Sequence, residues 1–423
     1  MTQVVLPADA TGAGDTGRGV TRAAAIAIFL SFAAAYFLSA LLRAVTATLA
    51  PVFSVELGVG AAQLGLLAGA FFLGFALMQL PLGMALDRYG ARRVLIALLS
   101  VAVGGCAGVA LAQGLPALVL ARALIGVGVS ACLMAPLTCY RHVFTPAAQL
   151  RANSWMLMSG SLGMMASTLP VQWLLPTLGW RGLFWWLAAC LVVAIAVIAW
   201  RAPRHVVGAM AIASFGDAAV GYGEIVRHPL FRCLAPLAFF VYGGMIALQA
   251  LWAGPWLTRV GGWSAQAAAG GLFVINLGML VAFMAWGLCM PRLTARGWDA
   301  LRLMRWGLPL SLVVLCINVL GGATTGAGAW AVWCVCSSFV TLSQPAVGLA
   351  FPAAQAGKAL SAFNLVIFLG VFAMQWGIGL LIDALMASGL SVTLSFQAAF
   401  AAFAVACVLS YLWFLRGVGA ARR

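Results

Sequence analysis

Residues 83–93 read GMALDRYGARR and stand between two long apolar stretches. One acid, Asp87, and three arginines, Arg88, Arg92 and Arg93, thus fall within eleven residues of a chain that is only 7% charged. Short charged segments between apolar stretches of this length are typical of the loops that join membrane-spanning helices. The segment therefore predicts a chain that crosses a membrane several times.

The composition also indicates a membrane protein. The chain has 423 residues, of which 65% are hydrophobic, so it cannot cover itself with a water-soluble surface. Its formal net charge of +15 comes from 22 arginines and one lysine, which flank apolar stretches rather than cluster on a polar domain. We therefore expect the lipid bilayer as its surroundings and no nucleic acid as a partner.

The apolar stretches divide into twelve candidate spans. A helix needs about 20 apolar residues to cross the hydrocarbon core, and charges and Gly/Pro clusters mark the breaks. The predicted spans are 24–51, 62–86, 94–113, 116–140, 154–176, 183–200, 232–257, 266–290, 302–320, 328–351, 361–384 and 392–415.

Positive charge lies almost entirely on one side of these spans. Nineteen basic residues fall on the side of both termini, whereas the other side has only Arg181 and Arg259. Because cytoplasmic loops carry the excess of Lys and Arg, both termini are predicted to be cytoplasmic. The preference for arginine over lysine, with abundant Ala and Gly, points to a GC-rich bacterial genome and hence to the cytoplasmic (inner) membrane.

The chain contains an internal repeat. A shift of 204 residues places Pro51 on Pro255, Gly58 on Gly262, Gly83 on Gly287, Arg88 on Arg292, Ala91 on Ala295 and Arg92 on Arg296. This pattern predicts an all-α integral membrane protein with two pseudo-symmetric six-helix bundles. The expected divisions are a disordered tail (1–22), the N-terminal bundle (23–200), a cytoplasmic linker (201–231), the C-terminal bundle (232–416) and a second tail (417–423).

The stretch at 83–93 resembles the G-x-x-x-D-R-x-G-x-R-R loop of the major facilitator superfamily (MFS). The matching residues are Gly83, Asp87, Arg88, Gly90, Arg92 and Arg93. The resemblance implies a twelve-helix transporter in which this loop is a conformational latch. The second copy, GLCMPRLTARG (287–297), has Pro291 in place of the acid, so it is better interpreted as a basic loop that sets topology.

A second match lies in the fourth predicted span. ARALIGVGVS (121–130) resembles the R-x-x-x-G-x-G pattern of the same superfamily through Arg122, Gly126 and Gly128. The resemblance implies an arginine buried near the substrate cavity and linked to proton coupling, with glycines that allow close helix contact. The fifth span lacks the tight Gly-Pro and Gly-Gly endings of drug/proton antiporters of the family, which weakens an assignment to export.

Two arginines, Arg43 and Arg122, lie inside predicted spans. Both enter from the same side, at depths of about 12 and about 9 Å at 1.5 Å per residue, and the superfamily fold would turn both toward a central cavity. All eight acids of the chain lie in loops or near span ends. Two guanidinium groups without a carboxylate predict a site for an anion.

Other roles for these arginines stay open. Arg43 can extend to the membrane surface, Arg122 can hold the fourth span against the first through backbone carbonyls, or the pair can serve proton coupling without an anion. Polar and aromatic residues on the expected cavity helices are further candidates, although each can instead join neighbouring helices. These candidates are Tyr36, Gln249, Trp252, Ser337, Ser338, Thr341 and Gln344, with Asn276, Asn364 and Gln375 as weaker ones.

The sequence contains no nucleophile–base pair, nucleotide-binding loop or metal-ligand cluster, so we expect neither an enzyme nor a cofactor or metal site. The leading hypothesis is a secondary active transporter that takes up or exchanges a small organic anion by alternating access, with or without a coupling proton. A proton-coupled exporter of drugs or metabolites is one alternative. A transporter-like receptor that senses a ligand is the other.

Overall fold

The computed structural model describes residues 21–203 and 215–420, which are helical apart from short connections. The predicted N-terminal tail, except residues 21 and 22, lies outside these residues. The last helix continues to Ala420, so residues 417–420 of the predicted second tail are helical.

The N-terminal half follows the predicted apolar stretches closely. Thr145 caps the helix that begins at Pro146, and Gly179, with a positive φ of 59°, turns the chain inside one assigned helix. The helices of this half are α1 (Arg22–Glu56), α2 (Ala61–Leu77), α3 (Gln79–Tyr89), α4 (Ala91–Leu111), α5 (Leu115–Val129), α6 (Met134–Val143), α7 (Pro146–Ala166) and α8 (Leu169–Arg201).

The C-terminal half begins with a short helix in the predicted linker, α9 (Phe215–Arg227). Three π-helical segments interrupt the next span, and a 3-10 segment interrupts the tenth predicted span. The elements are α10 (Pro229–Leu237), η1 (Ala238–Tyr242), α11 (Gly243–Ala247), η2 (Leu248–Trp252), α12 (Ala253–Pro255), η3 (Trp256–Val260), α13 (Ala265–Ala295), α14 (Ala300–Gly321), η4 (Gly322–Thr324), α15 (Ala327–Ser337), η5 (Ser338–Leu342), α16 (Ser343–Ala350), α17 (Ala353–Ala387) and α18 (Val392–Ala420).

Many helices are long and apolar enough to cross a membrane. By length and hydropathy, ten helical stretches in the described part of the chain qualify, or eleven if the bent pair α2 and α3 forms one span. The predicted number of twelve is therefore not confirmed. The difference arises at the predicted span 154–176, because α7 is not among the qualifying helices and residues 169–176 belong to α8, which counts once.

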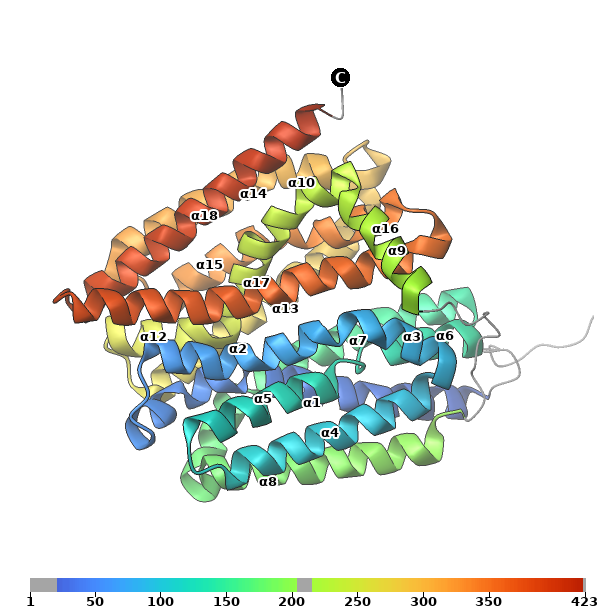
Figure 1. The fold of residues 1–423 in the computed structure, drawn as a ribbon, viewed down its shortest axis with the longest axis horizontal. Coiled ribbons are helices and arrows are strands. Elements are labelled where there is room, and N and C mark those ends of the chain that lie inside the picture. The colour runs from blue at the N-terminus through green and yellow to red at the C-terminus, as the bar shows by residue number, and fades with distance from the viewer. Residues whose placement is uncertain (1–20, 204–214, 421–423) are drawn as a thin grey trace, which may run out of the picture.

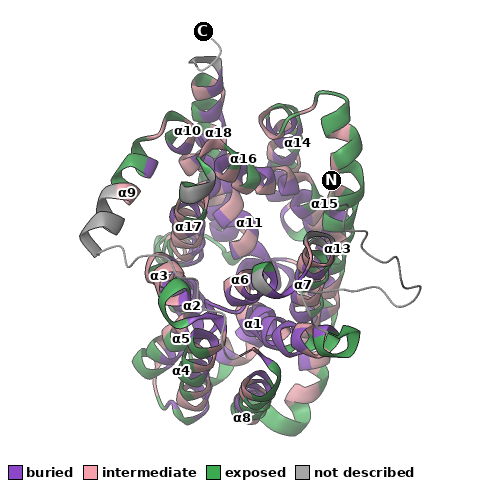
Figure 2. Ribbon diagram, turned by 90° about the vertical axis from the view of Figure 1, so that its right-hand side faces the viewer, coloured by how far each residue is buried: buried purple, intermediate pink, exposed green. Residues whose placement is uncertain are grey.

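The two halves lie one above the other, with the N-terminal half below in Figure 1. Gly58 and Gly262, which the 204-residue shift superposes, both adopt positive φ, at 62° and 68°. The repeat in the sequence thus has a counterpart in the backbone. We call the end of the bundle that carries Arg22, Arg88 and Arg227 the basic end, and Figure 2 views the molecule from there.

The halves approach each other most closely along α2 and α17. A side chain at Gly65 would overlap the carbonyl oxygen of Gln375, and one at Gly379 would overlap that of Ala61. Such glycines let two helix backbones approach closely in a membrane, where packing drives association. We call this contact, from Gly60 and Asp383 inward to Phe75 and Phe368, the α2–α17 seam.

At the end opposite the basic end, the carboxylate of Asp383 joins α17 to α2. Asp383 of α17 accepts hydrogen bonds from the backbone N–H groups of Ala61, at 3.0 Å, and Ala62, at 2.8 Å. These are unpaired donors at the N-terminus of α2, where the helix dipole also favours a negative charge. Nearby, Arg259 donates to Ser54 across the halves at 2.9 Å. Both contacts join the halves at this end.

Replacing Asp383 by Asn should loosen this end of the seam. The variant loses the charge that strengthens both hydrogen bonds, so backbone amide exchange at Ala61 and Ala62 should accelerate about tenfold. Hydrogen–deuterium exchange with mass spectrometry measures it. Asp299→Asn is the matched control, because Asp299 caps α14 within one half, at 2.6 Å from the Arg302 nitrogen. Unchanged exchange at Ala61 and Ala62 would contradict this function of Asp383.

Candidate functional site

Arg43 lies in the middle of α1, at the inner limit of the α2–α17 seam. Its guanidinium carbon is 5.4 Å from the ring centroid of Phe75 and 6.0 Å from that of Phe368. The side chain is partly exposed, and its Nε is buried without a hydrogen-bond partner. Among the described residues, no acceptor or carboxylate binds its guanidinium group. Arg43 therefore retains its donors for a ligand.

Residues from both halves surround this arginine. Its charge acts on Tyr36 of α1, Cys132 between α5 and α6, and Tyr242 of η1. Tyr36 packs on Gly160 of α7, where any side chain would overlap its ring. The structure therefore brings Arg43 and Tyr36, both predicted site residues, into one polar and aromatic environment.

A chain of hydrogen bonds begins at Tyr242. Its hydroxyl donates to Oε1 of Gln344 in α16 at 3.3 Å, and Nε2 of Gln344 donates to Oδ1 of Asn364 in α17 at 2.5 Å. Asn364 precedes Phe368 by one helical turn, so the amides lie about 6 Å along the α17 axis from the rings under Arg43. The predicted residue Gln344 thus belongs near the Arg43 site, together with the weaker candidate Asn364.

Arg122 lies elsewhere in the N-terminal half. It is 2% exposed, donates from Nη1 to the carbonyl oxygen of Leu42 at 3.0 Å, and has its guanidinium carbon 5.2 Å from the centroid of Phe71. Its surroundings and those of Arg43 have no side chain in common among these contacts. Arg122 nevertheless donates to the backbone of the residue that precedes Arg43, and its Nε and Nη2 are buried without a hydrogen-bond partner. Whether the two arginines share one anion site therefore stays a prediction.

Two predicted residues of the seventh span have different surroundings. Trp252 is fully buried and contacts Phe396 of α18 edge to face, with centroids 6.2 Å apart, so it does not line a cavity. Gln249 is 5% exposed and lies in η2, which packs on α1. The π-helical segments η1 and η2 change the rotation per residue along this span, so its side chains do not follow α-helical spacing.

The polar residues of the tenth predicted span have different surroundings. Ser337 is fully buried, and the hydroxyl of Thr341 donates to the carbonyl oxygen of Ser338 at 2.7 Å. Ser338 itself accepts a hydrogen bond from Trp286 at 2.9 Å. The 3-10 segment η5 lies between Ser337 and Gln344 and rotates them apart, so only Gln344 reaches the Arg43 surroundings.

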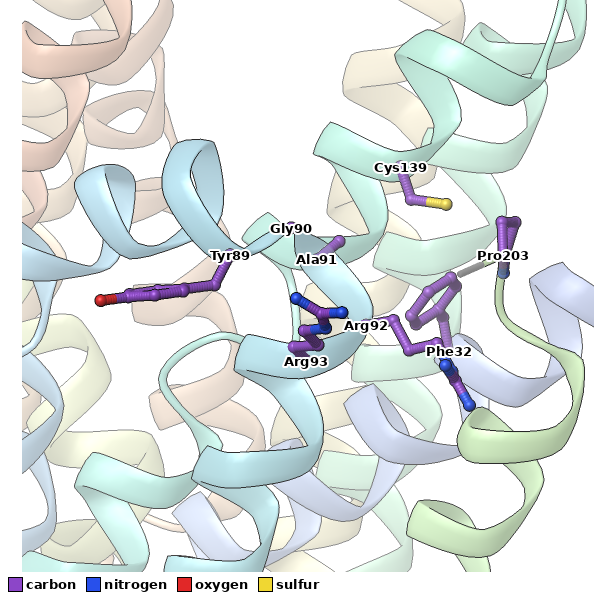
Figure 3. Close-up of a pocket in the computed structure, with 8 residues that line it drawn as sticks. All are labelled: Phe32, Tyr89, Gly90, Ala91, Arg92, Arg93, Cys139 and Pro203. Carbon is purple, nitrogen blue, oxygen red and sulfur yellow. The ribbon is translucent and has the colours of Figure 1, made fainter. Parts of the chain in front are cut away.

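The loop at 83–93 turns at Gly90, whose φ of 79° links the end of α3 to the start of α4. Figure 3 shows this turn beside Phe32, Cys139 and Pro203, with Arg92 directed toward Phe32. Arg92 donates to the carbonyl oxygen of Ala199 at the end of α8. This bond ties the loop to its own half.

The other predicted latch residues lie at the surface of the basic end. Asp87 and Arg93 are exposed, Arg88 lies over the ring of Tyr89 at 5.2 Å, and nothing lies within 4 Å of a Cβ placed on Gly83. Among the described residues, Asp87 has no ion pair, and Arg141 of the same half is the charge that acts on it. The contacts of these charged side chains lie within the N-terminal half, although α3 itself packs on α17 of the other half. The function of the loop as a latch stays a prediction.

Sequence reasoning missed three residues of the site. Phe75 and Phe368 lie on α2 and α17, which held none of the leading candidates, and apolar side chains carry no polar signal. Tyr242 lies on an expected span but was not singled out. Gly65 and Gly69, four residues apart in α2, were the available signal for a close helix pair at this position.

An all-helical bundle of two related halves, with an unpaired guanidinium group where the halves meet, defines a multi-pass membrane transport protein. The family model described as Major Facilitator Superfamily matches residues 32–373. The chain belongs to this superfamily, whose members are transporters and not enzymes.

One curated relative is similar over part of the chain. It is the 4-hydroxybenzoate transporter PcaK of Acinetobacter baylyi (strain ATCC 33305 / BD413 / ADP1), 29% identical over 136 residues. The match covers 32% of this chain and spans only 30% of the length of that relative. The match therefore supports a relationship between this chain and that transporter over these 136 residues only.

Solved structures agree with the fold over nearly the whole chain. A bacterial homolog of the human lysosomal transporter Spinster, in an inward-facing and unoccupied conformation, has a TM-score of 0.74 at 18% identity, covering 94% of this chain and 98% of that one. A D-xylose-proton symporter has a TM-score of 0.73 at 14% identity, with 92% and 97% covered. At such identities the likeness concerns the fold alone.

The glycines at 126 and 128 allow a prediction about packing. A side chain at Gly126 would overlap the Phe71 carbonyl oxygen, and one at Gly128 would overlap the backbone nitrogen of Ala102. Gly126→Ala should therefore destabilise the protein by about 1–3 kcal/mol, because the helices must separate. Thermal unfolding in detergent measures this. Gly104→Ala, at an α4 position with open space, should not lower the melting temperature. Equal melting temperatures would contradict the close contact.

Proposed function

We propose that this transporter carries a small organic anion by alternating access, with Arg43 as the residue that binds the anion's charge. The observation that carries the proposal is the partly exposed, unpaired guanidinium group of Arg43 where the two halves meet. An arginine held away from water without a partner is costly, so a ligand that completes its hydrogen bonds is stabilised there. A carboxylate matches the fork of guanidinium donors.

The walls of the site favour an anion with an apolar or flat body. Phe75 and Phe368 lie beside the guanidinium, and Tyr36 and Tyr242 stand within its electrostatic reach. Aromatic side chains bind flat apolar groups well. The relative named as a 4-hydroxybenzoate transporter agrees with an aromatic carboxylate, and the amides of Gln344 and Asn364 can bind a polar group at the other end of such a molecule.

The orientation in the membrane follows from charge. The sequence assigns nineteen basic residues to the side that carries Arg22, Arg88 and Arg227 and two to the other, so the basic end is assigned to the cytoplasm of a bacterial inner membrane. With this orientation, the α2–α17 seam and the Asp383 contacts lie on the outer side of Arg43, so we propose that this conformation closes the site toward the outside. Transport is uptake or exchange, with the site exposed alternately to each side.

Replacing Arg43 should abolish transport of carboxylates. In proteoliposomes, Arg43→Gln should reduce uptake of labelled benzoate and 4-hydroxybenzoate at least tenfold, because it removes charge-assisted hydrogen bonds worth about 1.5–3 kcal/mol. Arg43→Lys should retain part of the activity, since it keeps the charge but not the fork. Arg292→Gln is the control, because Arg292 is exposed and donates to Leu288 within α13. Full uptake by Arg43→Gln, or no flux and no thermal stabilisation of the wild type by either anion, contradicts the proposal.

A further inference from the structure

Arg43 contacts two phenyl rings that belong to different halves of the protein. Phe75 comes from α2 of the N-terminal half and Phe368 from α17 of the C-terminal half, and their ring centroids are 4.5 Å apart. The guanidinium carbon lies 5.4 and 6.0 Å from these centroids. Both distances fall within the range in which a cation is attracted to an aromatic ring.

The two rings form the innermost layer of the α2–α17 seam. From the opposite end inward, α2 meets α17 at Gly60 and Asp383, at Gly65 and Gln375, at Gly69 and Phe372, and then at Phe75 and Phe368. Opening the site on that side requires α2 and α17 to separate. The separation must therefore break the ring pair on which the guanidinium group lies.

From this geometry we infer that Phe75 and Phe368 couple the occupancy of Arg43 to the opening of the seam. The inference rests on the proposed function, since it takes Arg43 as the anion site. In the empty protein the unpaired positive charge attracts both rings and holds α2 against α17. A bound carboxylate neutralises the guanidinium group and draws it from the rings, so the attraction weakens and the seam can open.

The consequence is a preference for exchange over net uptake. After an anion is released into the cytoplasm, the empty protein is held closed on the outer side by the charged arginine and the ring pair. A cytoplasmic anion that binds Arg43 releases this restraint and leaves through the opened seam, and the site then accepts the next external anion. Uptake should therefore be faster into vesicles that already contain the anion.

Charge dependence distinguishes this coupling from simple packing of two rings. The attraction of a cation to an aromatic face is electrostatic, so it disappears when the cation is removed even if the rings remain. Phe75 and Phe368 are thus positioning residues that act through Arg43. Phe72 supplies a matched comparison, because its ring lies 6.3 Å from that of Phe368, whereas the contacts of the Arg43 guanidinium are with Phe75 and Phe368.

The test compares labelled benzoate uptake into proteoliposomes that are empty or preloaded with unlabelled benzoate. Preloading should accelerate uptake by the wild type about tenfold. Phe75→Leu and Phe368→Leu keep an apolar side chain but lose the ring, so their acceleration should fall to about twofold or less. Phe75→Tyr, which retains the ring, and Phe72→Leu should both keep the wild-type ratio.

A second measurement does not depend on flux. Benzoate should accelerate amide exchange in residues 58–70 of the wild type, whereas Phe75→Leu, Phe368→Leu and Arg43→Gln should exchange rapidly without it. A wild-type preloading ratio and wild-type exchange in both leucine variants would overturn the inference while leaving Arg43 as the anion site. Full benzoate uptake by Arg43→Gln would instead overturn the proposed function, and with it the coupling.

Discussion

A positive charge that has no ion-pair or hydrogen-bond partner among residues 21–203 and 215–420 lies at the meeting point of two helix bundles, and the rest of the structure depends on this constraint. Arg43 has lost part of its hydration, and its contacts with Phe75 and Phe368 replace it incompletely, since each is worth about 0.5–2 kcal/mol. Removing an ion from water costs several kcal/mol. The site is therefore suited to a ligand that brings negative charge and hydrogen-bond acceptors.

The packing of the halves determines where this charge lies. Glycines on α2 and α17 bring the two backbones together, and Asp383 fastens their far end through two backbone N–H groups. The phenylalanine pair ends this contact at the depth of Arg43. The helices α2 and α17 both close the site on this side and supply the rings beside Arg43. The residues that contact a bound anion are therefore also residues that hold the two halves together. Arg122 donates a hydrogen bond to the carbonyl oxygen of Leu42, the residue before Arg43, and so helps to fix the position of α1 beside α5.

The sequence was sufficient for the parts of the fold that depend on length, hydropathy and repetition. Long apolar stretches, a 204-residue repeat and the loop at 83–93 predicted helices in two halves and the superfamily. The sequence was insufficient to predict the directions of side chains where π-helical or 3-10 segments change the rotation per residue. The π segment that holds Trp252 and the 3-10 segment after Ser337 change the rotation per residue, and both side chains are fully buried. The roles of Phe75 and Phe368 depend on contacts between helices that no local pattern records.

The most direct measurement of the central claim is a solid-state NMR distance between the anion and the arginine. Protein labelled with ¹⁵N-arginine in lipid bilayers would be saturated with benzoate carrying a ¹³C-carboxylate. If Arg43 binds the anion, the carboxylate carbon and the guanidinium nitrogens should show dipolar coupling. This coupling should disappear in Arg43→Lys. Coupling that persists unchanged in Arg43→Lys, or no coupling in the wild type under conditions that support benzoate transport, would contradict binding at Arg43.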